Sequence, residues 1–306
     1  MKLKLSRNLL FIIAGIIASG FACCHFVLPK MIIEIDHGFI PKTEVPQSRK
    51  TALLASLKNV PTRFSVTSHD SFEIKGLISK ADPVSRKGAI ILAHGIRAYK
   101  EHFAPLARRA NDKGFDAILI DLRAHGESQG RYCTFGFHEK KDISRVIDYL
   151  EANGHADNLG IWGQSLGGAV AMHSLAHDSR LRFGIIESSF SDFDKTVHDY
   201  FKRFSGVNVP FFADFLIKRA GDIGEFDTQN VHPHLAARSV SQPVLISHGT
   251  ADGRIDIKYG RKNFQNLKSK KKRFVEVEGA NHVNVWQTGG ERYWAEVFGF
   301  IESSLK

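Results

Sequence analysis

Residues 159–172 read Leu159-Gly160-Ile161-Trp162-Gly163-Gln164-Ser165-Leu166-Gly167-Gly168-Ala169-Val170-Ala171-Met172. The apolar start is typical of a strand buried on both faces, and the end favours a helix. Gly163 and Gly167 stand two residues before and two residues after Ser165. A serine on a sharp strand-to-helix turn needs small neighbours there, because its backbone is strained and crowded. The stretch therefore predicts a nucleophile elbow, with the Ser165 hydroxyl above a sheet and at the positive end of a helix.

Strand-like and helix-like segments alternate along most of the chain. Continuous apolar runs occupy residues 89–93, 117–120, 159–162, 184–186, 244–246 and 274–277. Stripes with apolar residues at i, i+3, i+4 and i+7 begin at Phe103, Ile143 and Trp294. Two alternating segments, 62–67 and 72–79, predict an antiparallel hairpin. Together these patterns predict a mainly parallel sheet wrapped by helices.

Two of the later runs lead into loops that carry a carboxylate and an imidazole. Asp252 follows the run 244–246, and His282 follows the run 274–277. Open α/β sheets place their chemistry beyond the C-terminal ends of strands, so both side chains are expected near Ser165. His282 would take the Ser165 proton and return it to the leaving group, and Asp252 would hold the imidazole tautomer. The chain order of serine, acid and histidine fits these roles.

Other titratable residues stay open as alternatives for the same roles. Glu187, which ends the run 184–186, is the best alternative acid, followed by Asp192. The alternative bases are His232 and His234, which no strand precedes.

An oxyanion hole needs two backbone N–H groups aimed at the developing negative charge. Leu166, the residue after the candidate nucleophile, is expected to supply one of them. Ile96, in the loop after His94-Gly95, is expected to supply the other. The His94 side chain itself is expected to be structural.

The N-terminal segment 1–29 is first basic and then apolar. Its apolar stretch, 9–28, has roughly the 20 residues of a helix that crosses a bilayer. Three basic residues precede this stretch: Lys2, Lys4 and Arg7. The positive flank predicts a single-pass anchor with the catalytic domain outside the cytoplasm. A signal peptide cleaved near residues 18–20, which would release a secreted protein, and a lipoprotein signal at Cys23 are the alternatives.

The remaining domain organisation follows from proline content and segment length. Residues 30–61 contain Pro41, Pro46 and Pro61 and predict a stalk. Residues 62–306 then form the catalytic domain. Within it, about 191–241 is too long for an ordinary loop and predicts a short cap over the site. The cap is rich in phenylalanine, which favours an apolar or acyl substrate.

Charge and motif content argue against a nucleic-acid-binding protein and a metalloenzyme. The chain of 306 residues is 43% hydrophobic and carries a formal net charge of +10, with a basic run at residues 268–273. This run is interpreted as a solvated loop, or as a contact for anionic lipid headgroups. It lacks interleaved aromatic residues, so no nucleic-acid partner is expected. Neither zinc-type spacing nor an H-E-x-x-H pattern occurs, so no metal or other cofactor is expected.

Five stretches together resemble the landmarks of the α/β-hydrolase superfamily: 94–95, 121–128, 163–167, 248–252 and 279–282. Residues 134–142 are similar to the serine aminopeptidase-like, or acylaminoacyl-peptidase-like, branch of that superfamily. The resemblance runs from about residue 72 to the C-terminus. It implies a mainly parallel, eight-stranded sheet and a catalytic triad of Ser165, Asp252 and His282.

The sequence as a whole predicts a serine hydrolase that cleaves an ester or thioester bond of an acyl, lipid-like substrate through an acyl-enzyme intermediate. An aminopeptidase-like enzyme with the same triad is the alternative, because the branch contains both activities. A non-catalytic binding protein on the same fold is a further alternative, which the presence of every triad and elbow residue disfavours. The sequence does not indicate the oligomeric state.

Overall fold

The computed structural model describes residues 7–35 and 46–306. Within these residues, eight strands form one sheet in the order β1-β2-β4-β3-β5-β6-β7-β8. The strands are β1 (Thr62–Thr67), β2 (Glu73–Ser79), β3 (Gly88–Ala93), β4 (Phe115–Ile120), β5 (Leu159–Gln164), β6 (Phe183–Glu187), β7 (Val244–Gly249) and β8 (Lys272–Val277). The predicted hairpin is β1 and β2, which pair antiparallel to each other, and β2 pairs antiparallel to β4. From β4 to β8 every pairing is parallel, which confirms the mainly parallel sheet.

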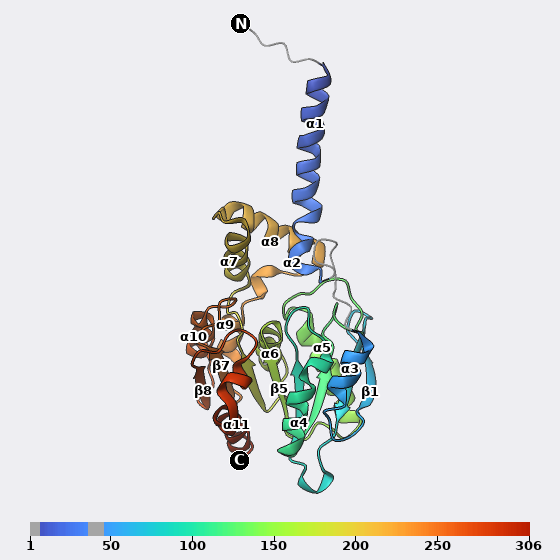
Figure 1. Ribbon diagram of the computed structural model, residues 1–306, viewed down its shortest axis with the longest axis vertical. Helices are drawn as coiled ribbons and strands as arrows, with labels where there is room; N and C mark the ends of the chain where they lie inside the picture. The colour runs from blue at the N-terminus through green and yellow to red at the C-terminus, as the bar shows by residue number, and fades with distance from the viewer. Residues whose placement is uncertain (1–6, 36–45) are drawn as a thin grey trace.

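Helices cover both faces of the sheet (Figure 1). One face packs against α5 (Glu139–Ala152), α6 (Leu166–His177) and α10 (Ile257–Asn266). The other face packs against α4 (Ala104–Asp112) and α11 (Val285–Ser304). The predicted apolar stripes are the buried sides of these helices, since Ile143 of α5 and Trp294 of α11 lie in the two cores. Strands β3 and β4 are buried on both sides along their whole length, as continuous apolar runs predict.

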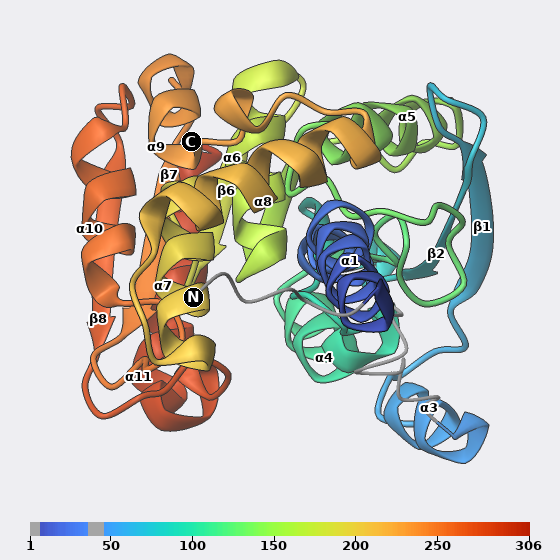
Figure 2. The same ribbon diagram turned by 90° about the horizontal axis from the view of Figure 1, so that it is seen from above.

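The segment between β6 and β7, which we call the cap region after the sequence prediction, is helical. It contains α7 (Phe193–Ser205), α8 (Pro210–Gly224) and the short α9 (Pro233–Ala236). Figure 1 shows α7 and α8 at the end of the body from which α1 (Arg7–Ala22) projects, and Figure 2 views this end from above. Gly206 ends α7 in the left-handed conformation, with φ 73°, and Pro210 begins α8. The two helices therefore form a hairpin with a tight corner.

The predicted transmembrane helix in residues 1–29 is not supported. The α-helix α1 has 16 residues, or about 24 Å at 1.5 Å per residue, and a hydrocarbon core is about 30 Å thick. At Cys23 the chain passes into a π-helix, Cys23–Val27. Among the described residues, no helix combines the length and the apolar character needed to cross a membrane. The predicted basic residues Lys2 and Lys4 lie outside the described residues.

Part of the predicted stalk packs onto the body. Ile33, in α2 (Lys30–Ile33), and Ile35 are buried in the main core. The Cys133 amide donates a hydrogen bond of 2.8 Å to the Ile33 carbonyl, and Glu34 forms an isolated bridge with Tyr132. Pro41 lies outside the described residues, and the chain resumes before α3 (Gln47–Leu54). Residues 30–35 are thereby tied to the catalytic body.

Candidate active site

Ser165 occupies a strained turn between β5 and α6. Its φ of 55° and ψ of −115° are rare for a side chain larger than glycine, and such strain concentrates at functional sites. Both flanking glycines are required by close backbone contacts. A Cβ on Gly163 would lie 1.9 Å from the Gly167 carbonyl oxygen, and one on Gly167 would lie 1.9 Å from the Ala93 carbonyl oxygen. The predicted elbow therefore has a steric reason in the neighbouring strand and helix.

The structure brings Ser165, His282 and Asp252 together in one hydrogen-bonded chain. The His282 Nε2 atom lies 2.9 Å from the Ser165 Oγ atom. The His282 Nδ1 atom lies 2.8 Å from an Asp252 carboxylate oxygen. His282 and Asp252 are buried, and Ser165 is partly exposed. With Nδ1–H donating to the carboxylate, Nε2 is free to accept the serine proton.

The Asp252 carboxylate is held as an anion by several donors. Its Oδ1 atom accepts the backbone N–H groups of Arg254 (2.9 Å) and Ile255 (3.0 Å). Burial opposes ionisation, but hydrogen bonds from His248 and His282 outweigh it and hold the pKa of Asp252 well below its usual value. The carboxylate therefore stays charged at neutral pH, as a group that stabilises an imidazolium must.

The loop after β3 lies against the nucleophile. A Cβ on Gly95 would be 3.4 Å from the Ser165 Cβ atom, so the backbone beside Ile96 passes close to the serine. Leu166, the other predicted oxyanion donor, is the first residue of α6, whose first backbone N–H groups have no partner within the helix. These positions suit a pair of main-chain donors directed at a developing oxyanion.

His94 supports this loop from within the core. Its Nε2 atom accepts the Leu122 N–H at 3.2 Å, so Nδ1 carries the proton and donates to the Gly95 carbonyl at 2.8 Å. Burial lowers the pKa of His94, which keeps the ring neutral. The contacts agree with the structural role expected from the sequence.

The alternative acid Glu187 is engaged elsewhere. Its carboxylate accepts hydrogen bonds from neutral donors, namely Gln164 Nε2 at 2.7 Å, Trp286 Nε1 at 2.9 Å and Tyr293 OH at 3.0 Å. Complete burial raises the pKa of Glu187, although the hydrogen bonds from these three donors act in the opposite direction. The Glu187 carbonyl oxygen also accepts the Ser165 N–H at 2.8 Å. This residue therefore lies behind the nucleophile turn rather than beside the imidazole.

The remaining alternatives form a separate cluster. Asp192 is held by Lys262, whose Nζ atom lies 2.8 Å and 2.9 Å from the two carboxylate oxygens. The His234 Nδ1 atom donates to the Ser191 carbonyl and lies 3.3 Å from Asp192, and His232 lies 4.0 Å from Asp192. The structure does not place these residues with Ser165 in a hydrogen-bonded chain.

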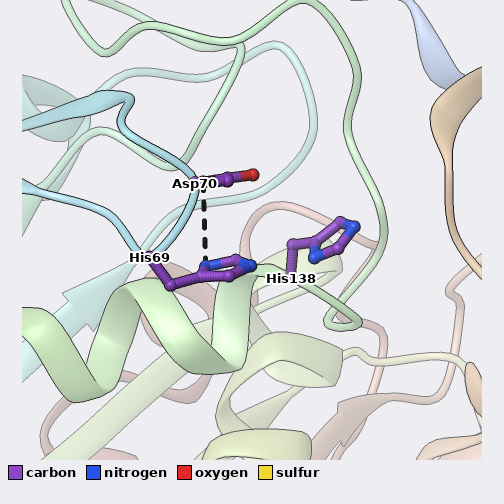
Figure 3. A group of neighbouring side chains, drawn as sticks. All are labelled: His69, Asp70 and His138. Atoms are coloured by element: carbon purple, nitrogen blue, oxygen red, sulfur yellow. Dashed lines mark ion pairs between the residues drawn. The ribbon is translucent and has the colours of Figure 1, made fainter.

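Two groups of side chains in the described part of the chain have the spacing of metal ligands. One is Asp192, His232 and His234, and the other is His69, Asp70 and His138 (Figure 3). Figure 3 shows the His69 and His138 rings side by side, with the Asp70 carboxylate paired to His69. In each group a basic side chain already binds the carboxylate, because Arg123 lies 2.9 Å from Asp70 and Lys262 holds Asp192. The positive charges of Arg123 and Lys262 disfavour a bound cation, so we assign no metal to either group.

Sequence analysis assigned no role to two further buried residues, although it included His248 in the stretch 248–252. The fully buried His248 has its Nε2 atom 3.2 Å from Asp252 and 2.8 Å from the Ile255 carbonyl oxygen. The fully buried Lys100, in the segment that follows β3, has its Nζ atom 2.6 Å from Asp121 and 2.7 Å from Glu127. His248 precedes Asp252 by only four residues, which is a signal that sequence analysis can use. The contacts of Lys100 with Asp121 and Glu127 join residues more than 20 positions apart and leave no local pattern.

The cap region reaches the loop that carries Asp252. The Arg203 guanidinium at the end of α7 donates to the Gly253 carbonyl at 2.6 Å. Phe193 and Phe226 of the cap region are buried against Phe135 or against each other. These aromatic residues pack the cap region onto the body, while Phe204 and Phe211 are exposed. Only some of the cap phenylalanines therefore pack against the body.

Comparison with known proteins gives consistent matches. A family model described as "alpha/beta hydrolase fold" matches residues 88–241, which is half of the chain. The uncharacterized protein YqkD of Bacillus subtilis is 24% identical over 307 residues, covering 95% of each chain. The putative esterase YitV of the same organism is 22% identical over 218 residues, covering 63% of this chain and 82% of its own.

A solved structure shows the same fold. The esterase Pf2001 of Pyrococcus furiosus superposes with a TM-score of 0.68 at 20% identity, covering 89% of this chain and 99% of its own. The matches do not single out the serine aminopeptidase-like branch, which stays a prediction. Because a family model matches half its length and its mainly parallel sheet carries an elbow serine, this chain belongs to the α/β-hydrolase fold family.

Proposed function

We propose that the protein is a serine hydrolase that cleaves ester or thioester bonds of apolar acyl substrates. The observation that carries this proposal is the chain of two hydrogen bonds that joins the Ser165 hydroxyl to His282 and His282 to Asp252. A serine hydroxyl is a weak nucleophile at neutral pH, and an adjacent base directed by a carboxylate is what activates it.

The reaction follows from the geometry in two halves. His282 Nε2 takes the proton as Ser165 Oγ attacks the substrate carbonyl carbon, and Asp252 stabilises the resulting imidazolium. The backbone N–H groups of Leu166 and Ile96 bind the oxyanion of the tetrahedral intermediate. As the intermediate collapses, His282 protonates the leaving alcohol or thiol and an acyl-enzyme remains. Water then attacks the acyl-enzyme with the same proton transfers, which frees the acid and restores Ser165.

The choice of an ester or thioester is supported by the cap region and by the relatives. The cap region reaches the loop of Asp252 through Arg203 and is rich in phenylalanine, which favours an apolar substrate. Among the similar proteins, YitV is named a putative esterase and Pf2001 an esterase. The predicted aminopeptidase activity would use the same groups on an amide, so only substrate preference separates the two activities.

The test is hydrolysis of p-nitrophenyl esters of increasing chain length, beside aminoacyl p-nitroanilides. We expect the esters to be preferred, and Ser165→Ala to lower kcat by about 10⁴-fold or more. Ser174→Ala is a matched control, because this buried serine lies on the same helix and its hydroxyl has no partner among the described residues. Preference for the anilides would assign a peptidase instead. Equal turnover by Ser165→Ala and wild type would reject the nucleophile.

A further inference from the structure

The corner between α7 and α8 exposes a cluster of large apolar side chains. We call residues 204–211 the cap tip. Four of its side chains are strongly exposed: Phe204 (80%), Val207 (53%), Val209 (43%) and Phe211 (84%). Every residue from 202 to 211 is exposed. Contiguous apolar patches on a soluble surface mark sites of interaction, whereas single exposed apolar residues are ordinary.

The position of the cap tip distinguishes it from the other exposed apolar residues of the body. Those residues are spread along the chain: Val60, Phe72, Val84, Ile96 and Val283, together with Leu235 in α9 of the cap region. The helices α7 and α8 instead lie at the end of the body from which α1 projects (Figures 1 and 2). The four exposed apolar side chains of the cap tip therefore lie at one end of the molecule.

A lysine-rich groove begins at the cap tip. Asn208 and Pro210 of the cap tip form part of its lining. The lysine groove, as we call it, then runs between α7 and α10 and contains four lysines: Lys195 and Lys202 from α7, and Lys258 and Lys262 from α10. A phosphate group entering this groove would meet several ammonium groups beside an apolar surface.

The carboxylates in and beside the lysine groove offset only part of this charge. Lys262 pairs with Asp192 and Lys258 pairs with Asp256, while Asp199 accepts the Tyr259 hydroxyl at 2.6 Å. Within the described residues, Lys195 and Lys202 have no ion-pair partner, and both are exposed. The sequence from 200 to 213 contains Lys202 and Arg203 and no Asp or Glu. The surface next to the cap tip is therefore positive as well as apolar.

We propose that the cap tip and the lysine groove dock together on an anionic phospholipid surface. Phe204 and Phe211 enter the boundary between headgroups and acyl chains, and Lys195 and Lys202 contact the headgroup phosphates. An apolar protein partner would account for the cap tip alone, and a free phosphate for the lysine groove alone. A lipid surface matches both. Docking of this kind needs no helix that crosses the bilayer.

The α7 helix connects the proposed docking surface to the candidate site. Arg203 stands between the cap tip and the loop of Asp252, where it binds the Gly253 carbonyl. A docked cap tip therefore holds the candidate site near the lipid surface. Lipid binding goes beyond the proposed hydrolysis and does not require Ser165, so Ser165→Ala is expected to bind vesicles like wild type.

The test places a reporter at the cap tip of the full chain. In Val207→Trp, the new indole is expected to be quenched by vesicles of chain-brominated phosphatidylcholine that contain phosphatidylserine. Val84→Trp is the matched control, because Val84 is 97% exposed and lies outside the cap region. The tryptophans of the wild-type chain provide the baseline. Quenching of Val207→Trp above both references supports docking through the cap tip, and its absence overturns the proposal.

Two double variants separate the contributions of charge and of apolar side chains to vesicle binding. Phe204→Ser/Phe211→Ser and Lys195→Glu/Lys202→Glu are each expected to weaken vesicle partitioning by about tenfold. Lys268→Glu/Lys270→Glu is the charge control, because these exposed lysines precede β8 and stand outside the lysine groove. All these residues are exposed, so the substitutions are expected to leave the fold intact. The thermal midpoint of each variant checks this.

Three results would contradict the proposal. Equal quenching of Val207→Trp by vesicles with and without phosphatidylserine would remove the role of the anionic headgroup. An equal loss of partitioning in the Lys268→Glu/Lys270→Glu control would make the effect one of net charge. A dimer that sedimentation velocity detects and that Phe204→Ser/Phe211→Ser dissociates, together with unquenched Val207→Trp, would assign the cap tip to a second copy of the chain.

Discussion

Asp252 can orient His282 only if its own carboxylate is held in place. The His248 ring, whose Nε2 atom lies 3.2 Å from that carboxylate, helps to hold it. The His248 ring is fully buried, with Nε2 close to both Asp252 and the Ile255 carbonyl oxygen. The ring therefore acts on the reaction through Asp252, as a positioning residue. Loss of such a supporting hydrogen bond affects the transition state more than substrate binding.

We therefore expect His248→Leu to lower kcat by about tenfold with little change in KM, whereas Asp252→Asn lowers kcat by about 10⁴-fold. Steady-state kinetics on the preferred ester measures both parameters. The thermal midpoint separates this effect from damage to the buried core. A His248→Leu enzyme with wild-type kcat would show that the ring only fills space.

At the scale of elements, the junction between β5 and α6 depends on backbone contacts that exclude any side chain. A methyl group on Gly167 would overlap the Ala93 carbonyl, so Gly167→Ala is expected to lower the free energy of unfolding by more than about 3 kcal/mol. Gly299→Ala is the matched control in the exposed part of α11, where nothing lies within 4 Å of the new Cβ. This change should stabilise the protein by about 0.5–1 kcal/mol. Urea denaturation measures both, and similar effects of the two substitutions would contradict the packing described.

The end of α6 is tied to α5 by an ionic network around Arg180. Arg180 binds Asp178, Asp148 and Glu151, and Asp178 also accepts the Ser144 hydroxyl. Burial alone would raise the pKa of Asp178, but hydrogen bonds from Arg180 and Ser144 lower it to about 2. A carboxylate with a depressed native pKa stabilises the fold above its unfolded pKa, and this contribution is lost as pH falls through the native pKa.

Asp178→Asn should therefore be less stable than wild type by about 1–2 kcal/mol at neutral pH. The difference should shrink as pH falls from about 4 toward 2, because wild-type Asp178 then becomes protonated too. Urea midpoints of both proteins across this pH range measure the effect. A difference that stays constant with pH would show that Asp178 acts without its charge.

At the scale of the whole molecule, the sequence predicted the positions of residues where a short local pattern could be combined with a general rule of sheet topology. Ser165, Asp252 and His282 each follow a strand-like run, and a parallel sheet brings the C-terminal ends of its strands to one edge. Three local motifs and one rule are therefore enough to predict that these residues lie together. Apolar stripes predicted the buried sides of α5 and α11 in the same way.

Features that depend on distant residues could not be predicted in this way. The buried Lys100 finds its carboxylates only when the chain folds, and the lysine groove joins Lys195 to Lys262 across 67 positions. The conspicuous basic run 268–273 instead enters β8, where the Lys272 ammonium donates to the Phe264 and Leu267 carbonyls. For the N-terminal segment, apolar composition predicted a spanning helix, but composition does not reveal where α-helical hydrogen bonding gives way to a π-helix at Cys23.

The central claim is that the imidazole of His282 makes the Ser165 hydroxyl reactive. A fluorophosphonate probe forms a covalent bond only with such an activated serine, and mass spectrometry of the digested protein locates the adduct. We predict one adduct, on Ser165, in the wild-type chain and no adduct in His282→Gln. An adduct on a different serine, or equal modification of Ser165 in His282→Gln, would contradict the account.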